Sequence, residues 1–132
     1  MSAASPPLVK PYNLSIEQRT GYLLARVSGY SASLETSRKY WNEIALETAG
    51  HNAKRLMVWE DFAGMISTQD TLTLVKEISR LPQFLTVRMV VLDEYPDQFD
   101  RNKLGEMIAN NHGLTCRVFS NFDEAEAWLL SA

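Results

Sequence analysis

The chain has 132 residues, enough for one domain with a buried core, and its 45% apolar and 22% charged residues are ordinary for a globular protein. Its net charge is −3 and its basic residues are scattered, which argues against a nucleic-acid partner. No apolar run approaches the roughly 20 residues of a membrane span, and the lone Cys116 excludes an internal disulfide and a cysteine-based zinc site.

The composition of the first 11 residues predicts an N-terminal segment, here called the lead-in, that precedes the folded domain. The opening MSAASPPLVKPY lacks the apolar segment of a signal peptide. Its serines and prolines predict a disordered or extended stretch over residues 1–11, followed by one domain over residues 12–132. A single cysteine fits a reducing compartment, so we expect a cytoplasmic protein.

Two strands and a helix are predicted next. Tyr12–Gln18 and Tyr22–Val27 form an antiparallel hairpin, because Thr20-Gly21 between them suits a tight turn. A helix follows, capped by Ser31 or Ser33. Gly50 is the expected left-handed residue that ends it.

The middle of the chain predicts a buried strand that passes into a second helix. The strand, Arg55–Trp59, is apolar on both faces, with Leu56 and Val58 on one and Met57 and Trp59 on the other. Parallel strands that are covered on both sides have this pattern. An acidic pair and a loop follow. Ser67, three residues before Asp70, then starts a helix that ends before Pro82.

The last third of the chain predicts two further strands, each followed by a helix. A strand at Val87–Leu92 precedes a helix that starts at Pro96, and a strand at Thr115–Phe119 precedes a helix capped by Asn121. The order ββαβαβαβα predicts an α/β fold with four helices and a five-stranded, mostly parallel sheet whose first strand is antiparallel. The predicted core contains Leu56, Leu72, Val75, Val90, Val118, Trp128 and Leu129, together with Val58.

Polar residues follow the parallel strands, whose carboxyl ends share one rim of the sheet. Glu60-Asp61 and Asp93-Glu94 could together hold a divalent cation, as in receiver domains. A receiver also carries a lysine after its last strand, and Phe119-Ser120-Asn121 has none. Acids at these positions are also explained by solvation or by nearby helix N-termini, so we predict no metal and no cofactor.

Catalytic chemistry finds little support. Ser67 and Thr68 open a helix where a phosphate would be stabilised, or they are ordinary capping hydroxyls. Gly64 is interpreted as a turn residue, because no second glycine accompanies it. Cys116 is interpreted as a buried structural thiol. We therefore predict a protein that is not an enzyme, with hydrolase or receiver-like activity as the remaining alternative.

The loop after the central strand is unusually apolar. Phe62, Met65 and Ile66 lie within about seven residues, and such loops pack inward or meet a partner. We expect Phe62 to point inward and the other two to lie at the rim. Together with Trp59, these residues could also line a site for a small apolar ligand.

Two runs of the chain are distinctive. One is Trp59-Glu60-Asp61-Phe62-Ala63-Gly64, and the other is the closing run from Asn111-His112-Gly113 through Arg117-Val118-Phe119-Ser120 to Glu124–Leu129. On these residues the chain from about Tyr12 to Ala132 resembles the SpoIIAA-like family, small bacterial domains related in fold to STAS domains. The resemblance implies a right-handed βα coil that binds proteins or small ligands. In anti-sigma-factor antagonists a serine at the start of the second helix is phosphorylated. Ser67 matches that serine by position only, since the flanking D-S-[ST]-G-L-like run is absent. The related CRAL-TRIO lipid carriers imply an apolar pocket.

The sequence thus predicts a bacterial regulatory module that binds a protein partner or a small molecule at the rim. The alternative is a carrier or sensor of a lipid-like ligand. A coil with strands in sequential order places its helices on one face, so a loop, the N-terminal arm or a second copy in a homodimer must cover the other. The candidate binding residues are Tyr30, Trp59, Glu60, Asp61, Phe62, Gly64, Met65, Ile66 and Tyr95.

Overall fold

The computed structural model describes residues 10–131, so residues 1–9 of the predicted lead-in lie outside the described residues. Its elements confirm the predicted order and fold class. They are β1 (Asn13–Arg19), β2 (Tyr22–Gly29), α1 (Leu34–Gly50), β3 (Arg55–Phe62), α2 (Thr68–Ile78), β4 (Arg88–Leu92), α3 (Phe99–Asn111), β5 (Thr115–Phe119) and α4 (Phe122–Leu130), with short 3₁₀ turns at Pro82–Phe84 and Pro96–Gln98.

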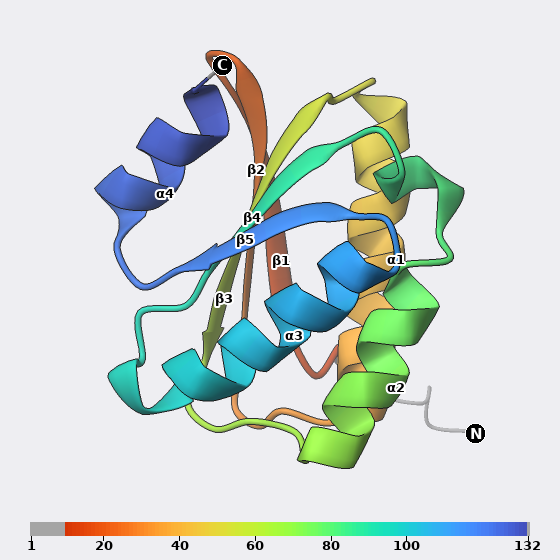
Figure 1. The fold of residues 1–132 in the computed structure, drawn as a ribbon, viewed down its shortest axis with the longest axis vertical. Helices are drawn as coiled ribbons and strands as arrows, with labels where there is room; N and C mark the ends of the chain where they lie inside the picture. The colour runs from red at the N-terminus through yellow and green to blue at the C-terminus, as the bar shows by residue number, and fades with distance from the viewer. Residues whose placement is uncertain (1–9, 132) are drawn as a thin grey trace, which may run out of the picture.

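The five strands form one sheet in the order β1-β2-β3-β4-β5 (Figure 1). β1 is antiparallel to β2, and the other three pairs are parallel. The hairpin turn places Gly21 at φ +87°, a conformation that glycine adopts without steric cost. The carboxyl ends of β2, β3, β4 and β5 therefore meet at one rim, as the sequence predicts.

β3 is longer than predicted. It continues through Glu60 and Asp61 to Phe62, because β2 also continues and pairs Gly29 with Phe62. Backbone pairing with a neighbouring strand outweighs the local signal of two acidic residues, which is typical of a loop. The acidic pair is thus part of the sheet, and the rim loop begins only at Ala63.

The end of α1 also differs from the prediction. Gly50 is the last residue of the helix, and the left-handed residue is Asn52, with φ 50°. Asparagine tolerates this conformation better than most residues, so it takes the role predicted for glycine. Ser33 caps the start of α1, and its side chain accepts a hydrogen bond from the backbone N–H of Thr36.

Helices cover both faces of the sheet (Figure 1). α1, α2 and α3 lie on one face, and α4 lies on the other. The prediction that all helices share one face was wrong for α4. The right-handed rule governs a connection between two parallel strands, and no strand follows α4 in the sheet. α4 therefore supplies the cover that a loop, an arm or a second copy was expected to supply.

The α4 face forms a small second core. Ala125 and Leu129 are fully buried against Met57 and Val90 of the central strands. At its margin the Arg88 guanidinium lies 3.8 Å from the centre of the Trp128 ring and donates a hydrogen bond of 2.9 Å to the Trp128 carbonyl. Arginine stacking thus closes the edge of this core.

Most of the predicted core residues are buried, but three are only half-buried. Leu72 and Val75 of α2 lie at the side of their helix, because α2 packs through Thr71, Leu74 and Ile78. Trp128 was also expected to be buried, but its ring lies at the margin under Arg88. The apolar stripe of α2 is therefore rotated from its predicted position.

The two neighbouring leucines of α4 test whether this helix closes the second core. Leu129 is 0% exposed and Leu130 is 40% exposed. We expect Leu129→Ala to lower the free energy of unfolding by about 2–4 kcal/mol and Leu130→Ala by about 0.5 kcal/mol. Chemical denaturation of the two variants measures this, and equal losses would contradict the assignment of α4.

Candidate functional site

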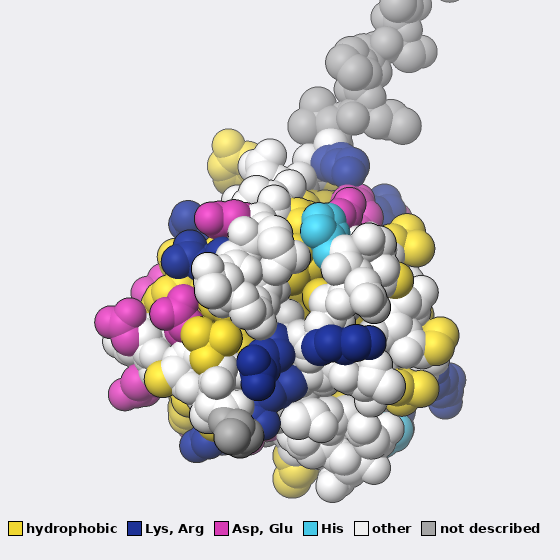
Figure 2. Space-filling view, turned by 90° about the horizontal axis from the view of Figure 1, so that it is seen from above, with side chains coloured by type: hydrophobic (Ala, Val, Ile, Leu, Met, Phe, Trp, Pro, Cys, Tyr) yellow, Lys and Arg dark blue, Asp and Glu magenta, His cyan; other side chains and the backbone are white. Residues whose placement is uncertain are grey.

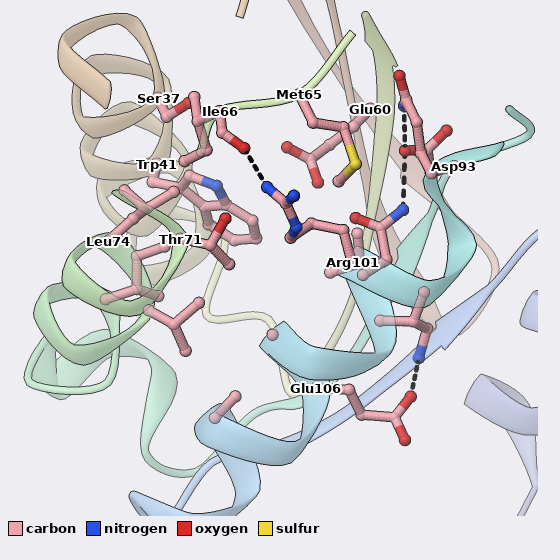
Figure 3. A pocket seen from close by; sticks show the side chains of 18 of the residues that line it. Ser37, Trp41, Glu60, Met65, Ile66, Thr71, Leu74, Asp93, Arg101 and Glu106 are labelled. Atoms are coloured by element: carbon pink, nitrogen blue, oxygen red, sulfur yellow. Dashed lines mark hydrogen bonds between the residues drawn. The ribbon is translucent and has the colours of Figure 1, made fainter. Parts of the chain in front are cut away.

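A cavity of about 130 Å³ lies between the sheet and helices α1, α2 and α3, beneath the rim loop Ala63–Ser67 (Figure 3). Its inner walls are apolar and include Trp41 of α1, Leu74 of α2 and Val91 of β4. Its outer part is polar and includes Glu60, Asp93 and Arg101. Such a combination of apolar walls and a few convergent polar groups is typical of small-molecule sites.

Glu60 enters this cavity because of the alternation of β3. Leu56, Val58, Glu60 and Phe62 point to the same face of the sheet, since successive side chains of a strand alternate. One oxygen of the carboxyl group accepts a hydrogen bond from the Tyr40 hydroxyl. The Tyr40 ring in turn stacks on Phe62, with ring centres 5.7 Å apart. α1 and β3 thus hold the carboxyl group in place together.

The surroundings of Glu60 favour its neutral form. Burial raises the pKa of this carboxyl to about 7, the hydrogen bond from Tyr40 lowers it, and the charge of Asp93 raises it. Burial also raises the pKa of Tyr40 well above its usual value. Glu60 therefore changes its charge near neutral pH, whereas Tyr40 stays neutral.

Asp93 organises the turn after β4. Its carboxylate accepts hydrogen bonds from Gln98 (2.7 Å), from Asn102 (2.8 Å) and from the backbone N–H of Tyr95 (3.0 Å). Gln98 also accepts a hydrogen bond of 2.6 Å from the N–H of Gly64, which has φ +118°. The start of α3 is thereby tied to the rim loop, and the backbone at residue 64 suits glycine.

Arg101 lies across the opening of the cavity. It extends from α3 and donates a hydrogen bond to the carbonyl of Ile66 in the rim loop (Figure 3). Among residues 10–131 no carboxylate forms an ion pair with it. Glu106, farther along α3, accepts a hydrogen bond of 2.7 Å from the N–H of Val118 and pairs with Lys103 at 2.9 Å.

The structure brings five of the predicted site residues to this cavity, namely Glu60, Phe62, Gly64, Met65 and Ile66. Phe62 is 5% exposed, as expected for an inward-pointing residue. Met65 and Ile66 are half-buried and line the cavity, and their role as a contact surface stays a prediction.

Trp59 and Asp61 were grouped with these residues, but they lie on the opposite face of β3. The Trp59 ring packs against Phe122 of α4, and the Arg26 guanidinium lies 4.2 Å from its centre. Asp61 accepts a hydrogen bond of 3.0 Å from the Tyr95 hydroxyl and lies 3.6 Å from Arg26. Because the strand continues past Trp59, the alternation of its side chains keeps Trp59 and Asp61 out of the cavity. A second hollow is lined by Trp59, Glu60, Asp61, Glu94 and Tyr95.

The other candidates lie on the outside of the rim. Tyr30 is fully exposed between β2 and α1. Ser67 is exposed and caps α2, with its side-chain oxygen accepting a hydrogen bond of 3.0 Å from the N–H of Asp70. Thr68 is the exposed first residue of the same helix. The capping prediction is confirmed, and phosphorylation of Ser67 or Thr68 stays a prediction.

Sequence reasoning missed the contribution of α3. The helical spacing of the large apolar residues predicts a buried face of Phe99, Leu104, Met107 and Ile108, but Phe99 and Met107 are exposed. The face toward the cavity includes instead Arg101, Asn102, Gly105 and Ala109. Gly105 follows Arg101 by four residues and Asn102 by three, and Ala109 follows Gly105 by four, so helical spacing places them on one face. Arg101 and Asn102 are polar and Gly105 has no side chain, so this face carries no apolar pattern in the sequence.

Other chemistry receives no support from the described residues. Burial, followed by the charges of Glu106 and Glu60, raises the pKa of the Cys116 thiol to about 12, so this thiol stays protonated. Within residues 10–131, no group of three or more His, Cys, Asp or Glu side chains is arranged to hold a metal ion. No helix in that part of the chain combines the length and apolar character that crossing a membrane requires.

The opposite end of the sheet differs from the rim in charge. Figure 2 shows Lys and Arg side chains near the centre of the end at which the parallel strands begin. Arg55 and Arg88 are the first residues of β3 and β4 there, whereas Glu60, Asp93 and Glu94 lie at the rim. Arg101 also lies at the rim, but acidic side chains outnumber basic ones among these residues there.

The order of the elements and the topology of the sheet are those of a SpoIIAA-like fold, and comparison with solved structures confirms this fold. An anti-sigma factor antagonist from Mycobacterium paratuberculosis matches 97% of this chain and 100% of its own with a TM-score of 0.60 and 12% identity. An uncharacterised protein with a SpoIIAA-like fold from Shewanella loihica matches 96% of this chain and 99% of its own, with a TM-score of 0.55 and 14% identity. No family model matches the sequence, and no curated protein does.

Replacement of Glu60 by glutamine tests the burial of its carboxyl group. The folded protein holds the proton of Glu60 up to a pKa of about 7, whereas an unfolded glutamate loses it near its ordinary pKa of 4.5. The wild type should therefore lose stability as the pH rises between these two values. Glu60→Gln retains the acceptor for Tyr40 and cannot ionise, so it should be more stable than wild type at pH 8 by on the order of 2 kcal/mol.

The gain in stability should disappear below pH 4.5, the ordinary pKa of a glutamate, where Glu60 is protonated in both the folded and the unfolded wild type. Thermal midpoints across this pH range measure the difference. Asp61→Asn, on the outer face of the same strand, is the matched control. A Glu60→Gln profile parallel to that of wild type would contradict the assignment.

Proposed function

We propose that this chain is a regulatory module without enzymatic activity that binds a partner protein at its rim. The observation that carries the proposal is the exposed rim surface formed by Tyr30 and by Ser67-Thr68. Tyr30 directly follows Gly29 of β2, which pairs with Phe62 of β3, so Tyr30 lies beside the start of the rim loop. Exposed tyrosines are frequent anchors of protein interfaces.

A change of charge at Ser67 provides the regulation in this proposal. A phosphate on the Ser67 oxygen would lie at the N-terminus of α2, where backbone N–H groups and the helix dipole stabilise negative charge. It would add a charge of about −2 to the surface that a partner contacts. The similar fold of an anti-sigma factor antagonist, by its description a protein that acts on another protein, supports this role.

We further propose a bacterial cytoplasmic setting. Cys116 is free and buried, which is compatible with a reducing compartment, and both similar structures come from bacteria.

Two substitutions at Ser67 separate its capping role from its regulatory role. Aspartate and asparagine both cap helices well, so Ser67→Asp and Ser67→Asn should keep the free energy of unfolding within about 0.5 kcal/mol of wild type. Only Ser67→Asp adds the negative charge. We expect Ser67→Asp alone to weaken partner binding by about tenfold, measured by titration with a partner isolated from the host. Equal affinities of the two variants would contradict a charge switch at this residue.

The partner surface is tested by introducing a charge at the rim and at a distant position. Tyr30 is 102% exposed and Leu46, on α1, is 67% exposed, so neither Tyr30→Asp nor Leu46→Asp should alter folding. We expect Tyr30→Asp to abolish recovery of the partner by the immobilised chain, and Leu46→Asp to leave it unchanged. Recovery of the same protein by both variants would overturn the rim proposal.

The cavity favours a second candidate function, the sensor of a small apolar ligand. A volume of about 130 Å³ is close to the ~150 Å³ of an engineered cavity that holds benzene. Such a space accommodates a molecule of about one ring rather than a long acyl chain. The lipid-like ligand of the sequence-based alternative therefore becomes a smaller molecule in this proposal. Native mass spectrometry of protein from its host tests it, since a loaded sensor would retain a bound mass.

A further inference from the structure

The charges around the cavity do not balance. Three carboxyl groups line it, on Glu60, Asp93 and Glu106, but Arg101 is the single cation among the described lining residues. Lys103 pairs with Glu106 from outside, at 2.9 Å. Arg101 can balance one of the remaining two carboxyl groups. The other lacks a positive partner among residues 10–131.

Asp93 accepts three hydrogen bonds through both of its oxygens, as a carboxylate does. Glu60 accepts one, from Tyr40, and none from any other described group. Glu60 is therefore the carboxyl group with an unused oxygen that faces the cavity (Figure 3). An isolated buried carboxylate is costly, so this group either takes a proton or needs a cation beside it.

We propose that the cavity binds a small primary amine carried on an apolar body of about one ring, with its ammonium group beside Glu60. The apolar body lies between Trp41, Leu74 and Val91, which supply the inner walls. The ammonium group donates a hydrogen bond to the unused oxygen of Glu60 and supplies the missing positive charge. This inference rests on the second candidate function, the small-ligand sensor.

The size of the cavity and the polarity of the molecule support this ligand class. A ring with one methylene and one amino group nearly fills a space close to that of a benzene-binding cavity, so a larger apolar body would not fit. Glu60, Asp93 and Glu94 lie at the rim, and this acidic end attracts a cation rather than an anion. A carboxylate ligand would meet Arg101 but would lie beside two further carboxyl groups.

Binding would exchange one proton for the ammonium group. Glu60 is protonated below neutral pH in the free protein, and a nearby cation stabilises its ionised form. The proton of Glu60 then passes to the solvent, and the O–H bond is replaced by an ion pair with the ligand. The titratable or charged groups that line the cavity with Glu60 are Tyr40 of α1, Asp93 after β4, Arg101 and Glu106 of α3, and Cys116 of β5. Asp61, Glu94 and Tyr95 line a second hollow with Glu60. Tyr40 and Cys116 stay protonated near neutral pH, so Glu60 accounts for the exchange.

The experiment uses the full chain and three probes of nearly equal size: benzylamine, the neutral benzyl alcohol and the anionic benzoate. Isothermal titration calorimetry measures each affinity at pH 8. We expect benzylamine to bind at least about tenfold more tightly than benzyl alcohol, and benzoate not to bind. At pH 6, titrations in buffers of different ionisation enthalpy should show that benzylamine binding releases between about half a proton and one proton.

Two variants test whether the preference for benzylamine and the proton release depend on Glu60. Glu60→Gln should lower the affinity for benzylamine to about that for benzyl alcohol and abolish the proton release. Asp61→Asn removes a carboxylate from the opposite face of β3 and should behave as wild type. The proton release of the wild type requires no variant, so it tests the inference even if Glu60→Gln does not fold.

The possible results separate this inference from the function on which it rests. Equal binding of benzylamine and benzyl alcohol, or tighter binding of benzoate, would contradict the proposed amine ligand. The cavity would still be a site for a small ligand. Tight benzylamine binding that persists in Glu60→Gln would also overturn it. If none of the probes binds, both the amine and the sensor function fail.

Discussion

The pairing of β3 with β2 up to Phe62 determines where every group at the rim lies. Side chains alternate along a strand, so each added residue is assigned to one face. The extra length carries Glu60 and Phe62 into the helical layer and turns Asp61 outward. The pairing depends on Gly29, because a Cβ atom there would lie 2.5 Å from the Phe62 ring. One glycine thus permits the contact that fixes the cavity wall.

Burial of a carboxyl group in this layer is unfavourable, and the fold offsets it in two ways. The Tyr40 hydroxyl donates a hydrogen bond to Glu60, and the raised pKa keeps the group largely protonated below neutral pH. Tyr40 and Asp93, the groups that act on Glu60, are far from it in the sequence. A half-buried residue that is destabilising in one charge state is characteristic of binding sites, where the local structure serves function at some cost to stability.

The sequence predicts the order of elements well because apolar alternation, caps and prolines are local signals. Ser33, Ser67 and Asn121 each cap a helix with a side-chain oxygen, and each was predicted or offered as an alternative. The length of β3 could not be predicted, since it depends on pairing with β2. The polar face of α3 was missed because the cavity that it lines exists only after α1, α2 and the sheet have packed together.

The position of α4 shows a second limit of local reasoning. Its apolar face is readable from the sequence, but the side of the sheet that it covers is not. The right-handed rule that places a helix between two parallel strands does not apply to a helix with no strand after it. The apolar residues on both faces of the central strands required a cover, and that requirement was correctly predicted, whereas its source was not.

The placement of α4 also has a consequence for synthesis of the chain on the ribosome. Met57, Val90 and Leu92 belong to strands that emerge early, but Ala125 and Leu129, which cover them, are translated last among the described elements. The helical face can form progressively, since each new strand pairs with the one before it. The α4 face stays open until the final helix has left the exit tunnel. Nascent chains stalled before α4 would therefore expose an apolar sheet surface, the kind of surface that chaperones bind and that aggregates form on.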